Sequence, residues 1–453
     1  MQADAVICGA GIAGIAAAYH LSVRHGMNRV VLVDERPPLT LTSDKSTECY
    51  RNWWPGPGNA MVALANRSID LLEGLARETD NAFHMNRRGY LFATAGDGLS
   101  LVELAREASD MGAGPVRIHN GSANSASYET HHPAKFEGQP DGIDIIRDRD
   151  MIRQRFPYLT AETTMVAHAR RCGWLSAQQL GMTLLEAARE NGTRLIRGQL
   201  ADIDVTGGQV CGVRVETPGG SETITTPVFI NAAGPFAPDI NRKLGIALPL
   251  ALEGHVKISF ADSRMAIPRD APLIIWTDPV TLPWQPEERA ALASSADTAH
   301  LLNQFPAGVH GRPEGRGDSV ILYWTYDVLS DAPVFPVPFD PAYPEIVTRG
   351  MSAAVPALAQ YFDHLPKPYI DGGYYTKTPE NRPLIGPLSV KGAFISSAYS
   401  GFGIMMAMAG GELLAAHAMD IALPAYAQAF DPARYDDPAY QVLLADWPDS
   451  GEL

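Results

Sequence analysis

The chain has 453 residues, 46% of them hydrophobic, which is long enough for two or three domains around large buried cores. Its 36 basic and 51 acidic residues give a net charge of −15, and no run of Lys or Arg is suited to neutralising duplex phosphates. We therefore expect no nucleic-acid partner. No stretch approaches the roughly 18 apolar residues that a membrane-spanning helix needs, so we expect no membrane span.

The N-terminus and the cysteines indicate the compartment. Residues 1–21 are apolar, but no basic segment precedes them and their glycines are spaced for a turn, so we expect no export signal. The four cysteines lack CxxC spacing, which argues against a disulfide framework or a zinc site. These features favour a soluble protein of the reducing cytoplasm that holds no metal.

The first 35 residues predict a strand, a turn, a helix and a second strand. The apolar run DAVIC ends at Gly9, and apolar residues then recur at helical spacing from Ile12 to Tyr19. The run RVVLVDE, residues 29–35, predicts a second buried strand that ends on acidic residues. The whole unit has about 30 residues, the size expected of a βαβ motif.

The turn of this unit has the sequence GAGIAG, a dinucleotide-binding pattern. Gly9 permits the tight turn, Gly11 lets the backbone approach a pyrophosphate, and Gly14 allows the helix to pack closely on the strand. Asp34 lies twenty residues after Gly14, at the end of the second strand, where its carboxylate can bind a ribose hydroxyl. The acid disfavours the 2′-phosphate of NADP, so these residues leave NAD and FAD open.

Further elements follow in chain order. We expect helices over residues 59–80 and 176–192, a strand over 87–94, and a loop-rich segment over 111–147. Short strands are predicted over 193–198, 200–205 and 210–217, and nucleotide-domain character returns at 226–234. Residues 250–365 alternate aromatic strands with Pro-rich connections, which is typical of a largely antiparallel sheet.

Three later stretches decide between the two cofactors. They are FINAAGPFAPDI at 229–240, GGYYTKTPENRPLIGP at 372–387 and YSGFGIMMAMAGGE at 399–412. In this order, after the opening motif, they resemble the D-amino-acid oxidase superfamily of FAD-dependent oxidoreductases, most closely the branch of sarcosine oxidase, glycine oxidase and dimethylglycine dehydrogenase. The resemblance covers nearly the whole chain.

The resemblance implies that FAD binds in an extended form, with its adenine half on the first βαβ unit. It also implies that the turn at 401–403 begins a helix whose free N–H groups and positive dipole end lie near the flavin carbonyls. The cofactor-binding residues that it implies, together with the opening motif, are Gly9, Gly11, Ile12, Ala13, Gly14, Asp34, Glu35, Arg36, Ser43, Ser46, Thr47, Leu200, Ala233, Gly234, Phe236, Tyr374, Gly401, Phe402, Gly403, Ile404 and Met405.

The expected fold class is α/β, or α+β overall. It combines a Rossmann-type FAD-binding domain with a discontinuous substrate domain built on a largely antiparallel sheet. We assign residues 1–85, 148–245 and 366–435 to the FAD-binding domain, residues 86–147 and 246–365 to the substrate-binding domain, and residues 436–453 to a C-terminal tail. Sarcosine oxidases attach their flavin through a Cys at the position of Gly373, so non-covalent FAD is expected here.

Several side chains are candidates for substrate binding and catalysis. Arg51 matches the arginine that binds a substrate carboxylate in the family, but its usual lysine partner is replaced by Met405. Glu48 stands where sarcosine oxidases carry an arginine, and it could pair with Arg51 or attract a cationic substrate. Aromatic rings in nearby segments can hold an alkylated amine by cation–π attraction. The full set of catalytic candidates is Arg51, Tyr375, His255, Trp324, Lys45 and Glu48.

The predicted function is oxidation of the C–N bond of a secondary or tertiary amine or an N-substituted amino acid. Hydride passes to flavin N5 and the resulting imine hydrolyses. Ile321 lies near the position of the lysine that helps sarcosine oxidases react with O₂, so O₂ and another electron acceptor both stay open. The alternatives are a non-catalytic FAD-binding scaffold protein and a hydroxy-acid dehydrogenase on the same fold.

Overall fold

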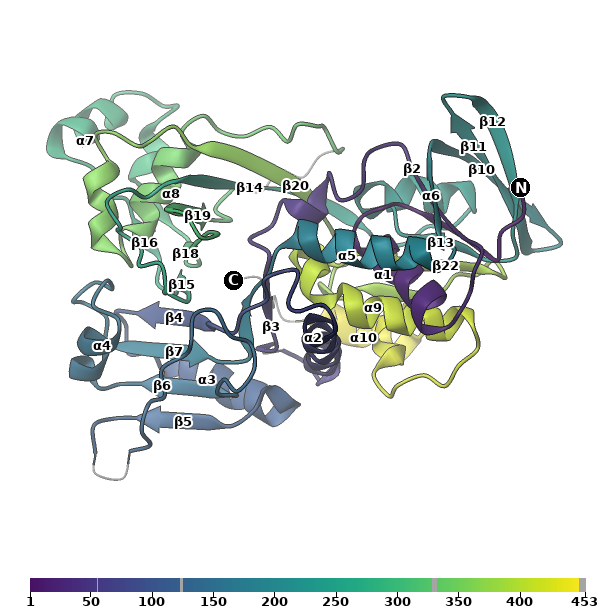
Figure 1. Ribbon diagram of the computed structural model, residues 1–453. Helices are drawn as coiled ribbons and strands as arrows, with labels where there is room; N and C mark the ends of the chain where they lie inside the picture. Colours follow the sequence, from purple (N-terminus) through teal and green to yellow (C-terminus); the bar gives the residue numbers. More distant parts are fainter. Residues whose placement is uncertain (55, 123–124, 328–331, 448–453) are drawn as a thin grey trace.

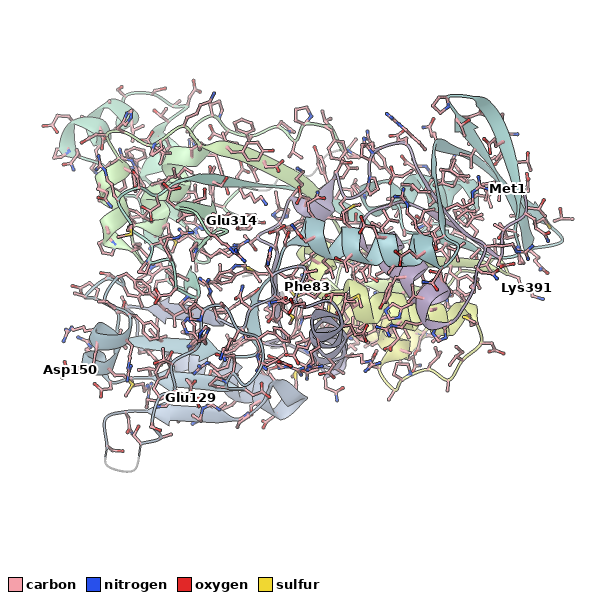
Figure 2. The ribbon with its side chains drawn as sticks, in the orientation of Figure 1. Met1, Phe83, Glu129, Asp150, Glu314 and Lys391 are labelled. Carbon is pink, nitrogen blue, oxygen red and sulfur yellow. The ribbon has the colours of Figure 1, made fainter. Side chains whose placement is uncertain are left out.

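The computed structural model describes residues 1–54, 56–122, 125–327 and 332–447. Figure 1 shows two parts, one built on a mainly parallel sheet with helices against it and one built on a larger, mainly antiparallel sheet. Side chains fill the molecule between them, and Phe83, labelled near the centre of Figure 2, is fully buried. In the described ranges no helix is both long and apolar enough to cross a membrane.

The mainly parallel sheet has six strands in the order β21, β22, β13, β1, β2, β9. Strand β1 pairs in parallel with both β2 and β13, because the chain crosses over through helices between them. The strand bounds are Ala5–Cys8 for β1, Val30–Asp34 for β2, Arg194–Arg197 for β9, Phe229–Asn231 for β13, Leu384–Pro387 for β21 and Ala393–Ser397 for β22.

Helices with wide apolar faces cover this sheet. Helix α1 carries three consecutive alanines at positions 16–18, all fully buried, and this small surface lets α9 pack closely against it. The helix bounds are Ile12–Tyr19 for α1, Ala60–Glu78 for α2, Ala177–Glu190 for α5, Ala237–Lys243 for α6 and Gly403–Ala418 for α9. A three-stranded antiparallel sheet lies beside them, formed by β10 (Gln199–Thr206), β11 (Gln209–Thr217) and β12 (Gly220–Thr225).

The larger sheet has nine strands in the order β20, β14, β19, β18, β15, β4, β7, β6, β5. Most neighbours are antiparallel, and the pairs β15 with β4 and β5 with β6 are parallel. The bounds are Tyr90–Thr94 for β4, Val116–His119 for β5, Ile143–Ile146 for β6, Met165–Ala169 for β7, Ala251–Ala261 for β14, Leu273–Trp276 for β15, His310–Pro313 for β18, Ser319–Tyr323 for β19 and Tyr369–Lys377 for β20.

The remaining elements are short. Strand β3 pairs with β8, and β16 pairs with β17. Their bounds are Cys49–Arg51 for β3, Cys172–Trp174 for β8, Val280–Thr281 for β16 and Gln304–Phe305 for β17. The other helices are Leu99–Ala108 for α3, Arg149–Arg155 for α4, Pro286–Ala293 for α7, Tyr343–Met351 for α8 and Pro438–Ala445 for α10.

The predicted fold class is confirmed, since a mainly parallel sheet with helices stands beside a largely antiparallel one. Strands β7 and β20 join the nine-stranded sheet, although the predicted boundaries assign residues 148–245 and 366–435 to the FAD-binding part. The β7 sequence MVAHA is apolar apart from His168, and β20 mixes aromatic, glycine and charged residues, so neither pattern says which sheet the strand enters. The domain division stays a prediction, and the last six residues of the predicted tail, 448–453, lie outside the described residues.

Candidate active site

A long cavity lies at the carboxyl ends of the parallel strands. Strands β1, β2, β13 and β22 all end at it, and the residues that follow each strand form its walls. This edge is where open α/β sheets bind ligands, because several loops and helix N-termini meet there. The sequence of the walls is mostly glycine, alanine, serine and threonine, so backbone rather than bulky side chains faces the ligand.

Glycines shape this cavity by close approach. Gly9 has φ of 111°, and a Cβ added there would lie 2.3 Å from the carbonyl oxygen of Ala232. A Cβ on Gly14 would lie 2.0 Å from the carbonyl oxygen of Gly9, so helix α1 can rest on the turn only with glycine at this position. A Cβ on Gly11 would point to Ser43 Oγ at 3.1 Å. The opening motif therefore has the geometry that the sequence predicts.

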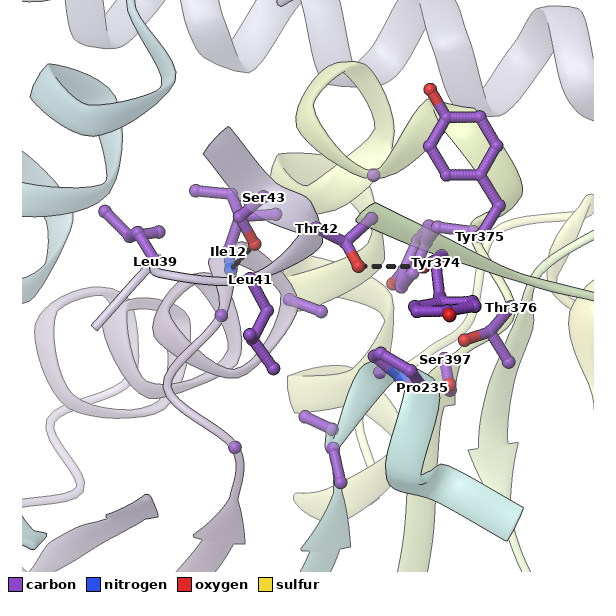
Figure 3. A pocket seen from close by; sticks show the side chains of 18 of the residues that line it. Ile12, Leu39, Leu41, Thr42, Ser43, Pro235, Tyr374, Tyr375, Thr376 and Ser397 are labelled. Atoms are coloured by element: carbon purple, nitrogen blue, oxygen red, sulfur yellow. Dashed lines mark hydrogen bonds between the residues drawn. The ribbon is translucent and has the colours of Figure 1, made fainter. Parts of the chain in front are cut away.

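The loop after β2 closes over the start of α1. Ile12 N donates a hydrogen bond to Ser43 Oγ at 2.9 Å, and Thr42 Oγ1 donates one to the carbonyl oxygen of Tyr374 at 2.7 Å. Figure 3 shows Thr42 pointing toward Tyr374 across the cavity, with this bond dashed. The loop thus joins the first helix to β20 of the other sheet, and the cavity runs between the two parts of the molecule.

Asp34 is held rigidly at the far end of the cavity. Its Oδ2 accepts a hydrogen bond from Ala10 N at 2.7 Å, and its Oδ1 accepts one from Arg36 N at 2.9 Å. Burial raises the pKa of this carboxyl, and the two backbone donors oppose that rise. Each carboxylate oxygen has further lone pairs, so Asp34 can still accept bonds from ribose hydroxyls.

Helix α9 begins at the other end of the cavity. Gly401, Gly403 and Ile404 line it, and no side chain caps the N-terminus of the helix. The residues just before it, Ala398 and Ser400, have φ of 56° and 51°, which turns the chain sharply from β22 into the helix. The free N–H groups of the first turn therefore point their positive dipole end toward the cavity.

The cavity fits an extended dinucleotide. It has an acid for the ribose, a glycine turn and helix N-terminus for the phosphates, and a second helix N-terminus for an electron-rich ring. The cofactor candidates that line it are Gly9, Gly11, Ile12, Ala13, Asp34, Arg36, Ser43, Ser46, Ala233, Gly234, Tyr374, Gly401, Gly403 and Ile404.

The other cofactor candidates lie elsewhere. Gly14 supports the turn from below, and Glu35 forms an ion pair with Arg36 at 2.8 Å. Phe236 packs under the Arg36 guanidinium, 5.4 Å from its ring centroid. Leu200 is buried in β10 outside the lining, so the role of its backbone stays a prediction. Thr47, Phe402 and Met405 line a second cavity, described next.

The second cavity adjoins the α9 end of the first. Both are lined by Ser46, Tyr375 and Gly401, so the two spaces meet at these residues. Its walls are mainly apolar or aromatic, from Tyr90, Leu273, Ile275, Tyr323, Phe402 and Met405. No aspartate or glutamate belongs to the residues that line it.

Arg51 is the permanent cation of this second cavity. The side chain comes from the short strand β3 and is 4% exposed. Its guanidinium carbon lies 4.7 Å from the Trp54 ring centroid and 5.7 Å from the Phe402 ring centroid. Aromatic rings thus hold the guanidinium in one orientation at reduced hydration, which suits a planar anion such as a carboxylate.

His310 is a second polar group in this cavity that the sequence did not indicate. Its Nδ1 lies 2.8 Å from the carbonyl oxygen of Gly308, and since a carbonyl only accepts, Nδ1 carries the hydrogen. Burial lowers the pKa of His310 to about 4, and the Arg51 charge adds to that shift. The neutral imidazole therefore presents Nε2 as a hydrogen-bond acceptor.

The remaining catalytic candidates divide into two groups. Tyr375 lines both cavities, whereas His255 and Trp324 line a neighbouring third cavity. Lys45 and Glu48 belong to ion pairs outside the lining: Lys45 Nζ is 2.8 Å from Asp371 Oδ2, and Glu48 Oε2 is 3.6 Å from Arg312 Nη2.

Two further observations concern predicted pairings. Glu48 Oε1 accepts a hydrogen bond from Ala177 N at 3.0 Å, so the carboxylate joins β3's loop to helix α5. Ile321 is buried in β19 and does not line the second cavity. On the adjacent strand β14, Lys257 Nζ donates a hydrogen bond to the Ser46 carbonyl oxygen at 2.6 Å. Only strand pairing reveals Lys257, because no motif surrounds it.

Comparison with known proteins decides the family. The model of the FAD dependent oxidoreductase family, DAO, matches residues 4–417. The chain belongs to this family of FAD-dependent oxidoreductases. The predicted family and the predicted FAD cofactor are thereby confirmed.

Individual relatives are distant. The chain is similar to the oxidoreductase YurR of Bacillus subtilis (strain 168), 25% identical over 262 residues, and this match spans 57% of the chain and 60% of that protein. The crystal structure of L-proline dehydrogenase from P. horikoshii superposes with a TM-score of 0.71 at 20% identity, covering 96% of this chain and 98% of that one. Glycine oxidase from Geobacillus kaustophilus gives 0.68 at 16% identity, covering 96% and 98%. These likenesses show a shared fold.

Proposed function

We propose that this FAD-dependent oxidoreductase oxidises the C–N bond of a secondary or tertiary amine, with an N-substituted amino acid as the best fit. The observation that carries the proposal is that the two cavities adjoin. The cavity with the buried Arg51 meets the flavin end of the cofactor cavity at Ser46, Tyr375 and Gly401. A molecule bound to Arg51 would therefore lie beside the redox ring.

The charges of the second cavity favour an anionic substrate group. Arg51 is buried, and the residues that line this cavity include no carboxylate. A guanidinium binds a carboxylate through two parallel N–H···O bonds, which fixes orientation as well as position. The apolar wall of Leu273, Ile275 and Met405 would hold the alkyl part of the substrate and exclude water.

The chain's own residues provide orientation and electrostatic stabilisation. The chemistry that FAD supplies when bound is acceptance of a hydride at N5 from the carbon next to nitrogen. Arg51 and the aromatic wall would aim that C–H bond, and the N-terminal turn of α9 would stabilise negative charge that develops beside it. The imine product would hydrolyse after release.

The names of the two similar structures support an amino-acid substrate. One acts on proline, which is a secondary amine and a carboxylate, and the other acts on glycine. Met405 replaces the lysine of sarcosine oxidases, so Arg51 would bind the carboxylate without that second cation.

An anaerobic reduction assay tests the proposal. The FAD-loaded enzyme is mixed without oxygen with proline, sarcosine and N,N-dimethylglycine, with the matched amines pyrrolidine and dimethylamine, and with lactate. We expect flavin absorbance to bleach with the amino acids and less readily with amines that lack a carboxylate. Bleaching by lactate alone would establish the hydroxy-acid alternative. Flavin that no compound reduces, in a protein with stable partner proteins, would establish the scaffold alternative.

The mode of FAD attachment and the electron acceptor need separate measurements. Gly373 in β20 offers no thiol, and a Cβ there would lie 3.0 Å from Thr42 Cα. We expect acid precipitation to release all of the flavin, and colour that stays with the pellet would contradict non-covalent binding. Mixing the reduced enzyme with O₂ and then with a dye acceptor shows whether it is an oxidase or a dehydrogenase.

A further inference from the structure

A pair of hydrogen-bonded side chains separates the substrate cavity from a neighbouring cavity. Tyr323 lines the substrate cavity, His255 lines the neighbouring one, and Thr325 lines both. Tyr323 and His255 sit on the adjacent strands β19 and β14 and are both nearly completely buried. The pair therefore joins the place where the amine would react to the neighbouring cavity.

The hydrogen bonds of this pair have a direction. His255 Nδ1 lies 2.7 Å from Tyr323 Oη, and His255 Nε2 lies 3.4 Å from Glu253 Oε2. A carboxylate only accepts, so Nε2 carries the hydrogen of the neutral imidazole and Nδ1 is the acceptor. Tyr323 consequently donates its hydroxyl hydrogen to His255, and its oxygen, which is also within hydrogen-bond reach of the Thr325 and Tyr375 side chains, acts as an acceptor toward the substrate cavity.

The outer end of the chain of bonds is a paired carboxylate. Glu253 also lies 2.8 Å from Lys377 Nζ, and its side chain is 25% exposed. The bond to His255 lowers the pKa of Glu253 to about 2, with Lys377 contributing, so the carboxylate stays ionised and faces solvent. The series Tyr323, His255, Glu253 thus leads from a buried cavity to water.

Stacking fixes the imidazole in this orientation. The His255 and Tyr375 ring centroids are 4.1 Å apart with 22° between the planes, and Tyr375 itself lines the substrate cavity. The charged groups around His255 are Glu253 on its own strand, Lys377 on β20, and Asp327 and Asp340 in the neighbouring cavity. The histidine therefore has carboxylates on the side away from the substrate.

An amine substrate needs such a path. It arrives mainly as an ammonium ion, whereas hydride can leave the adjacent carbon only when the nitrogen lone pair is free. The substrate cavity has no carboxylate among its lining residues to take the proton, and His310, beside Arg51, is a poor base. A proton left near Arg51 would be repelled by the guanidinium, so it has to leave the cavity.

We propose that Tyr323 and His255 carry the ammonium proton of the substrate out of the substrate cavity toward Glu253. The substrate N–H gives its proton to Tyr323 Oη as the tyrosine hydroxyl proton passes to His255 Nδ1. The resulting imidazolium stays bonded to the ionised Glu253 carboxylate and releases its Nε2 proton past that carboxylate to solvent. Only protons move in this step, no electron or carbon bond is involved, and it precedes the oxidation of the proposed function on which it rests.

The test is the pH dependence of anaerobic flavin reduction in Y323F and H255Q. Above the pKa of the free amine the substrate arrives deprotonated and needs no relay. We expect each variant to reduce its flavin roughly 10- to 100-fold more slowly than wild type near pH 7, the size of a general acid–base contribution, and to approach the wild-type rate near the amine pKa.

A matched control exists in the same chain. Tyr128 Oη lies 2.9 Å from His168 Nδ1 in another buried tyrosine–histidine pair, and neither residue lines the cofactor cavity or the substrate cavity. Y128F should keep the wild-type rate at every pH. Loss of rate in Y323F that is the same at all pH values would show a purely structural role and overturn the proposal, as would variants that stay within twofold of wild type.

A second measurement avoids turnover. ¹⁵N NMR of the substrate-free holoenzyme distinguishes the two neutral imidazole tautomers, and we expect His255 to carry its hydrogen on Nε2 and His310 on Nδ1. A hydrogen on Nδ1 of His255 would reverse the bond to Tyr323 and overturn the relay. A wild-type flavin that no amine reduces would overturn the proposed function itself, and the relay with it, whereas an active wild type with unaffected variants would overturn the relay alone.

Discussion

The two cavities of this oxidoreductase are built in opposite ways. The cofactor cavity is lined mainly by glycine and other small residues that follow strands of the parallel sheet, and Tyr374, Tyr375 and Thr376 of β20 form part of its wall. The proposed substrate cavity is lined by side chains from β4, β15, β18, β19 and β20 of the nine-stranded sheet, from the short strand β3 and from the start of α9. One is a property of a local motif and the other of the packing between parts.

This difference has a mechanical reason. A phosphate is recognised by N–H groups that every residue carries, so the binding motif needs only the correct backbone path. The carboxylate of an amino acid is recognised by a cation, and its alkyl part by the shape of the cavity. The side chains that form such a cavity can come from any strand that passes nearby. Substitutions should therefore separate the two cavities cleanly.

The largest effect is expected where a side chain would enter the backbone cradle. In G11V the new side chain would fill the approach to the first turn of α1 beside Ser43, so we expect FAD affinity to fall at least 100-fold, on the order of 3 kcal/mol. Flavin fluorescence titration measures the affinity. The matched control is G74V in α2, where an added Cβ meets nothing within 4 Å; equal loss of FAD in both variants would contradict the distinction.

An effect of similar size concerns the buried His310 and acid stability. Its pKa of about 4 lies below the ordinary 6.5, so between these values the unfolded chain binds a proton that the native state does not. Stability should then fall as the pH drops from 6.5 toward 4, by on the order of 3 kcal/mol for this one group. Urea unfolding of H310Q should show a correspondingly weaker pH dependence, with the exposed H300Q as control. An unchanged slope would refute the assignment.

Arg51 should affect the substrate cavity alone. In R51M we expect the KM for an N-substituted amino acid to rise roughly 10- to 100-fold, because a charge-assisted bond to the carboxylate is lost. The KM for the matched amine without a carboxylate should hardly change, and FAD affinity should equal that of wild type. An equal loss for both substrates would mean that Arg51 supports the fold rather than the carboxylate.

The smallest expected effect tests the hydrogen bond between Thr42 and Tyr374. T42V removes the hydroxyl that donates to the Tyr374 carbonyl oxygen at 2.7 Å, a bond worth about 1 kcal/mol. We expect FAD affinity to weaken about fivefold with little change in substrate KM. As a control, T40V removes the hydroxyl of Thr40, which lines the same cavity but donates only to Pro37 O within its own loop. A T42V variant that loses substrate binding but keeps FAD would show that this hydrogen bond supports the substrate cavity and not the cofactor cavity.

The cofactor-binding motif could be predicted from the sequence. Gly9, Gly11, Gly14 and Asp34 lie within one βαβ unit, where the chain is short enough that spacing in sequence fixes spacing in space. The turn at 401–403 came from the family resemblance, and the structure gives Gly401 a tertiary reason, because a Cβ there would lie 2.7 Å from the Tyr375 ring. Arg51 and Tyr375 came from the family resemblance rather than from any local pattern.

The other side-chain contacts of the site depend on how the chain packs. His310 meets Tyr323 because β18 pairs with β19, and His255 meets Tyr323 because β14 pairs with β19. Glu253 lies two residues from His255 on the same strand. Glu48 and Lys45 looked like substrate ligands until packing gave them Arg312 and Asp371 as partners. The pattern of a strand predicts which of its residues share a face. Which strand it pairs with depends on burial over the whole sheet, so the local sequence around these residues does not predict it.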